Sequence, residues 1–206
     1  MADTMNERKA EINRKTKETE ISLSLQLDGK GESQINTGIG LLDHMLELFT
    51  FHGLFDLTIN AQGDIKKVDI HHTNEDIGIV LGKAFKEALG EKASIRRFGS
   101  ASVPMEDVVA RVTADISGRG HFKMQSEITT QPSETEEGYS FSDVEHFLDS
   151  LAKNLGMNLV VNVDNLVEDV HTNLEPIFKA LGIAMDQATQ IDPRRDGIPS
   201  TKGVID

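Results

Sequence analysis

The segment Asp69–Asp76 reads Asp-Ile-His-His-Thr-Asn-Glu-Asp and joins two adjacent histidines to a carboxylate. On a helix, His71 and Glu75 share one face, because side chains four residues apart lie one above the other. His72 projects about 100° away from His71, so an adjacent histidine pair on a helix suits two metal ions better than one. Imidazole together with carboxylate is a ligand set for Mn, Fe or Zn. A hydrogen-bonded or exposed pair of histidines is the simpler interpretation of one such motif on its own.

That simpler interpretation loses weight because the chain repeats the motif 100 residues later. Asp169–Ile177 aligns with Asp69–Ile77 without a gap. The alignment places His171 and Glu175 at the spacing of the first histidine and the glutamate of the first motif. A chance His-x3-Glu pattern would have no reason to recur in register with its flanking residues.

The remaining histidines also follow the repeat. Upstream of each motif a histidine follows an acid, in Asp43-His44 and in Glu145-His146. Of the seven histidines only two, His52 and His121, do not lie on repeat positions; the other five are His44, His71, His72, His146 and His171. The sequence therefore predicts an internal duplication, with a first structural repeat at residues 1–98 and a second at residues 99–206, together forming one compact unit.

Apolar periodicity predicts that strands and helices alternate in both halves. Strands are predicted at residues 21–27, 54–61, 108–116, 121–128 and 159–163, and helices at 41–51, 74–89, 143–155 and 177–187. Residues 129–139 are predicted to form a polar loop without a core residue. Because the helices are amphipathic, we expect them to pack against the inner faces of sheets in an α/β or α+β arrangement.

Composition excludes several classes of protein. A formal net charge of −13 argues against non-specific binding to nucleic acid or to an anionic membrane surface. The absence of cysteine excludes disulfides and thiolate metal sites. No apolar run approaches the roughly 20 residues of a membrane span, and residues 1–15 lack the apolar segment of a signal peptide. We therefore expect a cytoplasmic protein.

Basic residues beside glycine or serine form a second candidate set. In an acidic chain, such side chains are candidates for binding phosphate, since guanidinium groups and turn amides match phosphate oxygens. The set comprises Arg96, Arg97, Arg119, Lys179 and Lys202. For any one of them, a solvated surface charge is the simpler explanation, and nothing in the tail at residues 198–203 decides between the two.

The order and spacing of short motifs resemble the imidazoleglycerol-phosphate dehydratase family, from about Arg14 to Val204. The motifs that carry the resemblance are Arg14-x-Thr16-x-Glu18-Thr19, Thr37-Gly38-Ile39-Gly40, Asp43-His44-Met45, His71-His72-x-x-Glu75-Asp76, Arg97-Phe98-Gly99, Asp115-x-Ser117-Gly118-Arg119, Glu175-x-x-Phe178-Lys179-Ala180 and Pro199-Ser200-x-Lys202-Gly203. The resemblance implies an α+β fold in which two mixed β-sheets enclose a layer of helices. It also implies a homo-oligomeric shell of 24 subunits with active sites between subunits.

The activity implied by the resemblance is the removal of water from imidazoleglycerol phosphate to give imidazole-acetol phosphate, a step of histidine biosynthesis, with two Mn(II) ions. One ion would be held by His44, His72, His171 and Glu175, and the other by His71, Glu75, His146 and the position of Thr172. Substrate contacts would come from Glu18 of a neighbouring subunit and from His44 and His52. Phosphate would be bound by Arg97, Arg119, Lys179, Ser200, Thr201 and Lys202.

The proton lost in this reaction sits on carbon and is not acidic. Metal ligation can convert the imidazole of the substrate to an imidazolate, whose electrons can expel the hydroxyl group. Glu18 is the candidate for moving the carbon-bound proton, and His71, His72 and Glu75 complete the predicted catalytic set.

Two residues depart from the family pattern. Thr172 stands where the family has the second histidine of the repeated pair, and Pro176 where it usually has alanine. Proline disfavours helical geometry at the residue before it, so the second helix is predicted to begin near Asn173 or Leu174, with His171 preceding it.

Three interpretations remain in view. We favour a working dehydratase, because loss of function should not spare Glu18 and the phosphate set while changing a metal ligand. The alternative is a catalytically impaired, metal-stapled oligomeric homologue, which Thr172 and Pro176 would favour. An unrelated metal-dependent hydrolase would leave the long order of motifs unexplained.

Overall fold

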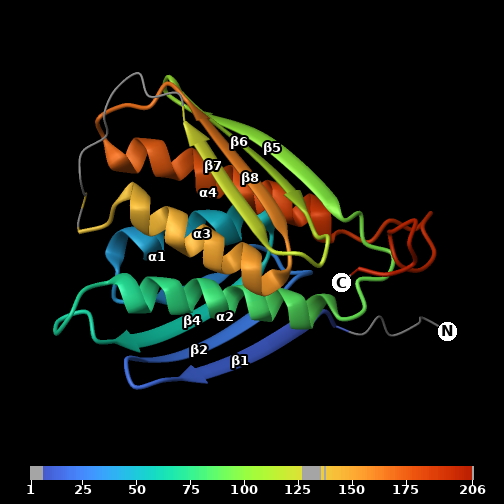
Figure 1. The fold of residues 1–206 in the computed structure, drawn as a ribbon, viewed down its shortest axis with the longest axis horizontal. Helices are drawn as coiled ribbons and strands as arrows, with labels where there is room; N and C mark the ends of the chain where they lie inside the picture. The colour runs from blue at the N-terminus through green and yellow to red at the C-terminus, as the bar shows by residue number, and fades with distance from the viewer. Residues whose placement is uncertain (1–6, 127–135, 137, 206) are drawn as a thin grey trace.

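Two four-stranded sheets enclose the helices in the computed structural model, which describes residues 7–126, 136 and 138–205 (Figure 1). The first sheet has the order β1-β2-β4-β3, with bounds β1 Lys9–Lys15, β2 Thr19–Gln26, β4 Asp56–Gly63 and β3 Ser33–Asn36. The second has the order β5-β6-β8-β7, with bounds β5 Phe98–Met105, β6 Val108–Asp115, β8 Asn158–Asp164 and β7 His121–Ser126. In each sheet one pair is parallel, β3 with β4 and β7 with β8, and the other pairs are antiparallel. The predicted α+β fold with two mixed sheets and an internal duplication is confirmed.

The helices follow the same repeated order. They are α1 Gly40–Gly53 and α2 His71–Leu89 in the first half, and α3 Phe141–Leu155 and α4 Val170–Thr189 in the second. Each lies between the sheets, with α2 beside α3 and α1 beside α4 (Figure 1). Strand residues alternate between this interior and the outside, as in β2, where Ile21, Leu23 and Leu25 are buried.

Glycines let the paired helices approach closely. A Cβ atom built on Gly82 of α2 would lie 2.7 Å from the carbonyl oxygen of Leu151 in α3. At the position 100 residues later, a Cβ atom on Gly182 of α4 would lie 2.4 Å from the carbonyl oxygen of Phe49 in α1. The backbones of each helix pair are therefore in contact, and a larger residue at either glycine would force the two helices apart.

The prediction that the last helix begins near residue 173 is wrong. Helix α4 begins at Val170, and the side chain of its N-cap, Asp169, accepts a hydrogen bond of 2.7 Å from the backbone N–H of Thr172. This cap starts the helix early, and Pro176 lies inside it. Pro176 is the seventh residue of the helix, and its missing N–H removes the intrahelical hydrogen bond to the carbonyl oxygen of Thr172. His171 is therefore helical, and it shares a face with Glu175.

Tyr139 corrects the prediction of a loop without a core residue at 129–139. Its side chain is completely buried, and its hydroxyl group donates a 2.7 Å hydrogen bond to Asn74 on α2. Burial, followed by the charge of Asp143, raises the pKa of Tyr139 well above its ordinary value. Residues 127–135 and 137, which include the end of the strand predicted at 121–128, lie outside the described part of the chain.

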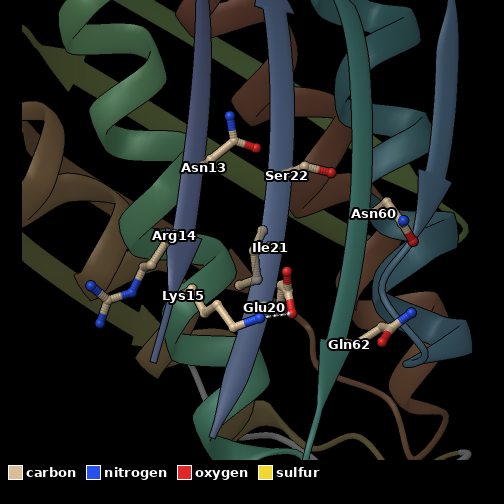
Figure 2. Close-up of a pocket in the computed structure, with 8 residues that line it drawn as sticks. All are labelled: Asn13, Arg14, Lys15, Glu20, Ile21, Ser22, Asn60 and Gln62. Carbon is tan, nitrogen blue, oxygen red and sulfur yellow. Dashed lines mark hydrogen bonds and ion pairs between the residues drawn. The ribbon is translucent and has the colours of Figure 1, made fainter. Parts of the chain in front are cut away.

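The outer face of the first sheet is polar (Figure 2). A hollow on this face is lined by outward strand side chains such as Asn13, Ser22 and Asn60, and by Lys15 and Glu20, which form a 2.6 Å ion pair. None of the predicted metal or phosphate ligands lines this hollow, so the candidate site lies elsewhere. In the described part of the chain, no helix is both long enough and apolar enough to cross a membrane.

Candidate active site

Helices α1 and α4 bring three of the predicted metal ligands together. One donor atom each of His44, His171 and Glu175 lies within 4.8 Å of the other two. Nε2 of His171 is 3.0 Å from Oε2 of Glu175, and Nε2 of His44 is 3.9 Å from the same oxygen. The group, called the α1/α4 cluster below, exists because the two helices pack side by side and present these side chains to one another.

The carboxyl group of Glu175 is held in its ionised form. Partial burial raises its pKa, but hydrogen bonds from Lys179 and His171 outweigh this effect and hold the pKa below its ordinary value. Nζ of Lys179 forms an ion pair with the Glu175 carboxylate. A carboxylate that stays ionised beside two imidazoles is a suitable donor set for a divalent cation.

Helices α2 and α3 form a related group, called the α2/α3 cluster below. Nε2 of His71 is 3.9 Å from Oε2 of Glu75, and the rings of His71 and His146 have centroids 5.1 Å apart. These three residues line a small pocket with Asp149 and Ser150, which sequence reasoning missed. Each cluster therefore takes a His and Glu pair from one half of the chain and a histidine from the other half.

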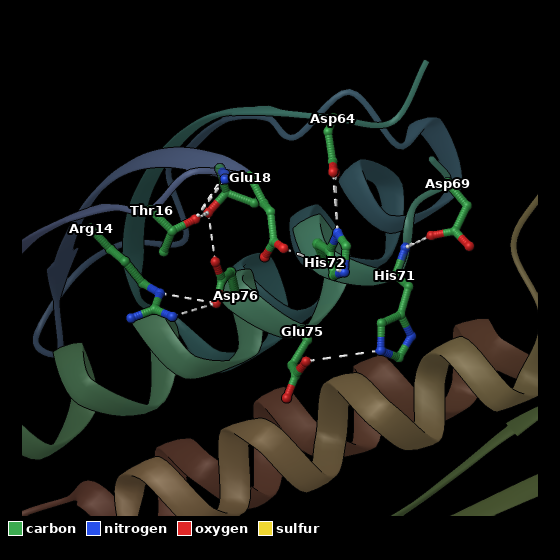
Figure 3. Close-up of polar contacts among 10 residues, drawn as sticks. Arg14, Thr16, Glu18, Asp64, Asp69, His71, His72, Glu75 and Asp76 are labelled. Carbon is green, nitrogen blue, oxygen red and sulfur yellow. Dashed lines mark hydrogen bonds and ion pairs between the residues drawn. The ribbon is translucent and has the colours of Figure 1, made fainter. Parts of the chain in front are cut away.

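His72 belongs to neither cluster within one chain. Its Nδ1 faces Asp64 at 3.2 Å, and its Nε2 is 3.9 Å from Oε1 of Glu18, as Figure 3 shows. The hydrogen bond with Asp64 raises the pKa of His72, an effect that partial desolvation opposes. The structure thus places His72 with Glu18, at the turn between β1 and β2, and apart from its three predicted co-ligands.

A second pocket gathers most of the predicted phosphate ligands. Its lining includes Arg97, Arg119, Ser200, Thr201 and Lys202, together with Ser117, Val204 and Ile205. Ser117 was missed, although the Ser-Gly-Arg turn that carries it was visible in the sequence. Its hydroxyl group accepts a 3.4 Å hydrogen bond from the backbone N–H of Arg119.

Arg97 is held firmly at the edge of this pocket. Its Nε donates to Asp115 at 2.7 Å and its Nη1 to the carbonyl oxygen of Pro199 at 3.0 Å. These bonds connect the start of β5, the end of β6 and the C-terminal segment. The pocket therefore unites residues about 100 positions apart in sequence.

Four of the predicted substrate-binding residues do not line this pocket: Glu18, His44, His52 and Lys179. Lys179 pairs with Glu175 in the α1/α4 cluster. His52 lies in the last turn of α1, where burial and then the positive charge of Lys179 lower its pKa. Arg96, also considered for phosphate from the sequence, is absent from the pocket lining.

Known proteins resemble this chain over most of its length. A family model described as imidazoleglycerol-phosphate dehydratase matches residues 37–185. A relative of that name from Geobacter metallireducens is 52% identical over 198 residues, covering 96% of this chain and 99% of the relative. Another from Geobacillus sp. is 49% identical over 198 residues, with the same coverage of both chains.

Solved structures show the same similarity. A crystal structure of imidazoleglycerol-phosphate dehydratase from Staphylococcus aureus matches with a TM-score of 0.77 and 33% identity, covering 89% of this chain and 99% of the other. One from Pyrococcus furiosus matches with a TM-score of 0.78 and 35% identity, covering 94% and 99%.

Proposed function

Because this chain belongs to the imidazoleglycerol-phosphate dehydratase family, whose members are hydro-lyases of histidine biosynthesis, we propose that it converts imidazoleglycerol phosphate to imidazole-acetol phosphate. We further propose that two Mn(II) ions take part, one at each histidine and glutamate cluster. The observation that carries the proposal is the α1/α4 cluster, in which two imidazoles and one ionised carboxylate converge.

The donor chemistry fits a divalent cation of this kind. Each cluster carries two imidazoles and one carboxylate, but among the described residues only the α1/α4 cluster has one donor atom of each side chain within 4.8 Å of the other two. Six-coordinate Mn(II) leaves further positions for substrate and for another protein ligand. The predicted fourth ligand of the α1/α4 cluster is His72, which lies with Glu18 at a different place on the same chain. We propose that a second copy of the chain supplies His72 and Glu18 together, which accords with the expected 24-subunit assembly.

The chain's own residues would divide the remaining work. Arg97, Arg119 and Lys202 bind the phosphate group, and Ser200 and Thr201 add hydrogen bonds, since these side chains line one pocket. Glu18 takes up the carbon-bound proton as a general base. Bound metal ions would supply Lewis-acid chemistry that makes the imidazole ring of the substrate easier to deprotonate. Lys179 keeps Glu175 ionised through their ion pair.

Formation of imidazole-acetol phosphate from imidazoleglycerol phosphate tests the proposal, with metal removed by chelation and then added back as Mn(II). We expect activity to disappear on chelation and to return with Mn(II). The variant His171→Ala should not recover, whereas His121→Ala, which changes an exposed histidine of β7, should recover like the parent. Full activity in protein shown to be free of metal would contradict the metal assignment. Absence of turnover in metal-loaded protein would instead support the catalytically impaired alternative.

A further inference from the structure

The turn that carries Glu18 is closed by a threonine side chain. Thr16 Oγ1 accepts hydrogen bonds of 3.0 Å from the backbone N–H groups of both Glu18 and Thr19. The backbone N–H of Thr16 in turn donates 2.9 Å to the carbonyl oxygen of Thr19. These bonds fix the shape of the turn, but they do not fix where it sits on the rest of the molecule.

A single carboxylate on α2 fixes that position. Asp76 Oδ1 accepts a 2.9 Å hydrogen bond from Nε of Arg14 and lies 2.8 Å from its Nη2 (Figure 3). Asp76 Oδ2 accepts a 2.5 Å hydrogen bond from the hydroxyl group of Thr19. Arg14 lies on β1 before the turn and Thr19 begins β2 after it, so one side chain holds both ends of the turn.

Asp76, called the anchor below, lies on the same helix face as His72. His72 and Asp76 are four residues apart on α2, so their side chains project from the same side, one turn apart. The carboxylate of Glu18 is about half exposed, yet it lies 3.9 Å from Nε2 of His72. An exposed glutamate would sample many positions if its backbone were free to move. The network through Asp76 therefore supplies the restraint that the side chain lacks.

The second half of the chain provides an internal comparison. There, Met105 pairs with Val108, so only Glu106 and Asp107 form the turn between the strands. The first half has four residues, 16–19, between the paired Lys15 and Glu20. Pro176 occupies the position that corresponds to Asp76, so this half lacks the carboxylate as well as the longer turn. The extended turn and its anchor thus occur together, in the half that carries Glu18.

We propose that Asp76 is a positioning residue that acts through Thr19 and Arg14 to hold the Glu18 carboxylate against His72. The inference rests on the proposed role of Glu18 as the general base. It predicts that loosening the anchor impairs proton transfer and leaves binding of the phosphorylated substrate intact, because the phosphate pocket lies elsewhere.

The variant Thr19→Val tests this role, since it removes the hydroxyl group and preserves the side-chain shape. We expect kcat to fall by about tenfold to a hundredfold, as for a misplaced catalytic group, with KM changed by less than about twofold. Thr19→Ser keeps the hydroxyl group and should retain most of the activity of the parent. Thr113→Val makes the same change at an exposed position of β6 and should leave kcat unchanged.

A double-mutant cycle separates positioning from a general structural effect. In a Glu18→Gln background, Thr19→Val should lower kcat by less than about twofold further, because the group that it positions has already been disabled. If Glu18→Gln lowers kcat and Thr19→Val then lowers it further by the full tenfold to hundredfold, the positioning role of Asp76 is overturned, whereas the role of Glu18 stands. Unchanged kcat in Glu18→Gln itself would overturn both.

Hydrogen exchange gives a measurement that does not depend on activity. In metal-free protein, the amides of residues 16–19 should exchange faster in Thr19→Val than in the parent or in Thr113→Val. Unchanged exchange in a folded variant would overturn the proposal. Should Thr19→Val fail to fold, Asp76→Asn removes the charge at constant size, and the same cycle and exchange measurement apply to it.

Discussion

Gly182 sets the distance between α1 and α4, and its replacement by alanine should destabilise the protein measurably. The added Cβ atom would lie 2.4 Å from the carbonyl oxygen of Phe49, where ordinary contact begins at 3.4 Å, so the helices must separate by about 3.4 − 2.4 = 1.0 Å. The obstacle is a backbone atom that cannot rotate aside, and overpacking of this kind costs about 3 kcal/mol, the upper part of its usual range. Alanine favours the helix by about 1 kcal/mol over glycine, which leaves a net loss of about 2 kcal/mol.

Thermal unfolding of the metal-free protein measures this effect. For a chain of this length, a loss of about 2 kcal/mol should lower the Tm by about 4–8 °C. Gly82→Ala makes the corresponding change between α2 and α3, with a Cβ to carbonyl distance of 2.7 Å, and should lower the Tm by a smaller amount. Because α1 and α4 also carry the α1/α4 cluster, Gly182→Ala should weaken Mn(II) binding as well. An unchanged or raised Tm would show that the helices separate without cost and would refute the reasoning.

Three further predictions concern the phosphate pocket, the buried tyrosine and the missing histidine. Lys202→Ala should raise KM about tenfold to a hundredfold, the usual value of a charge-assisted contact, whereas Lys123→Ala on the exposed side of β7 should not; an unchanged KM would remove Lys202 from the pocket. Since the folded-state pKa of Tyr139 is raised, the unfolded chain loses that proton first as pH rises above about 10, so stability should fall by up to about 1.4 kcal/mol per pH unit there. Denaturant titrations of Tyr139→Phe should show a smaller fall than the parent, and an equal fall would assign it to other groups. Thr172→His should increase Mn(II) occupancy, measured by metal analysis after dialysis, and no change in occupancy would place Thr172 outside the site.

The four helices were predictable because each carries a continuous apolar stripe, but three strands were not. Strands β1, β3 and β5 lie at the edges of their sheets and contain mostly polar or half-exposed residues. What orders such strands is the ladder of backbone bonds to a neighbour, which leaves little pattern in the sequence. The start of α4 was predicted too late, because the N-cap hydrogen bond to Asp169 outweighs the local effect of Pro176.

In the candidate site, too, some residues could be predicted from the sequence, and the contacts of others depend on the fold. The duplicated motifs single out the histidines and glutamates of the two clusters, because the repeat marks them as equivalent, whereas the resemblance to the family predicted how they are grouped. Asp76 is part of the first motif, but neither its contacts nor those of Asp64 could be predicted, because nothing in the local sequence indicates them. Their roles depend on the turn between β1 and β2 lying against the first turns of α2.

The two related clusters differ in the ligand that we expect another chain to supply, so the two proposed metal positions should be chemically unequal. In the proposed assembly the α1/α4 cluster gains an imidazole, His72, from another chain, whereas the α2/α3 cluster meets Thr172 at the corresponding position. A neutral hydroxyl group is a weaker ligand for a divalent cation than an imidazole. Water must therefore complete the coordination of the ion at the α2/α3 cluster. The α2/α3 cluster should therefore lose its metal first as free Mn(II) falls, and activity should follow the occupancy of that cluster. Equal affinity of the two clusters in a metal titration would contradict this argument, because it would show that replacing the fourth imidazole with Thr172 does not weaken metal binding.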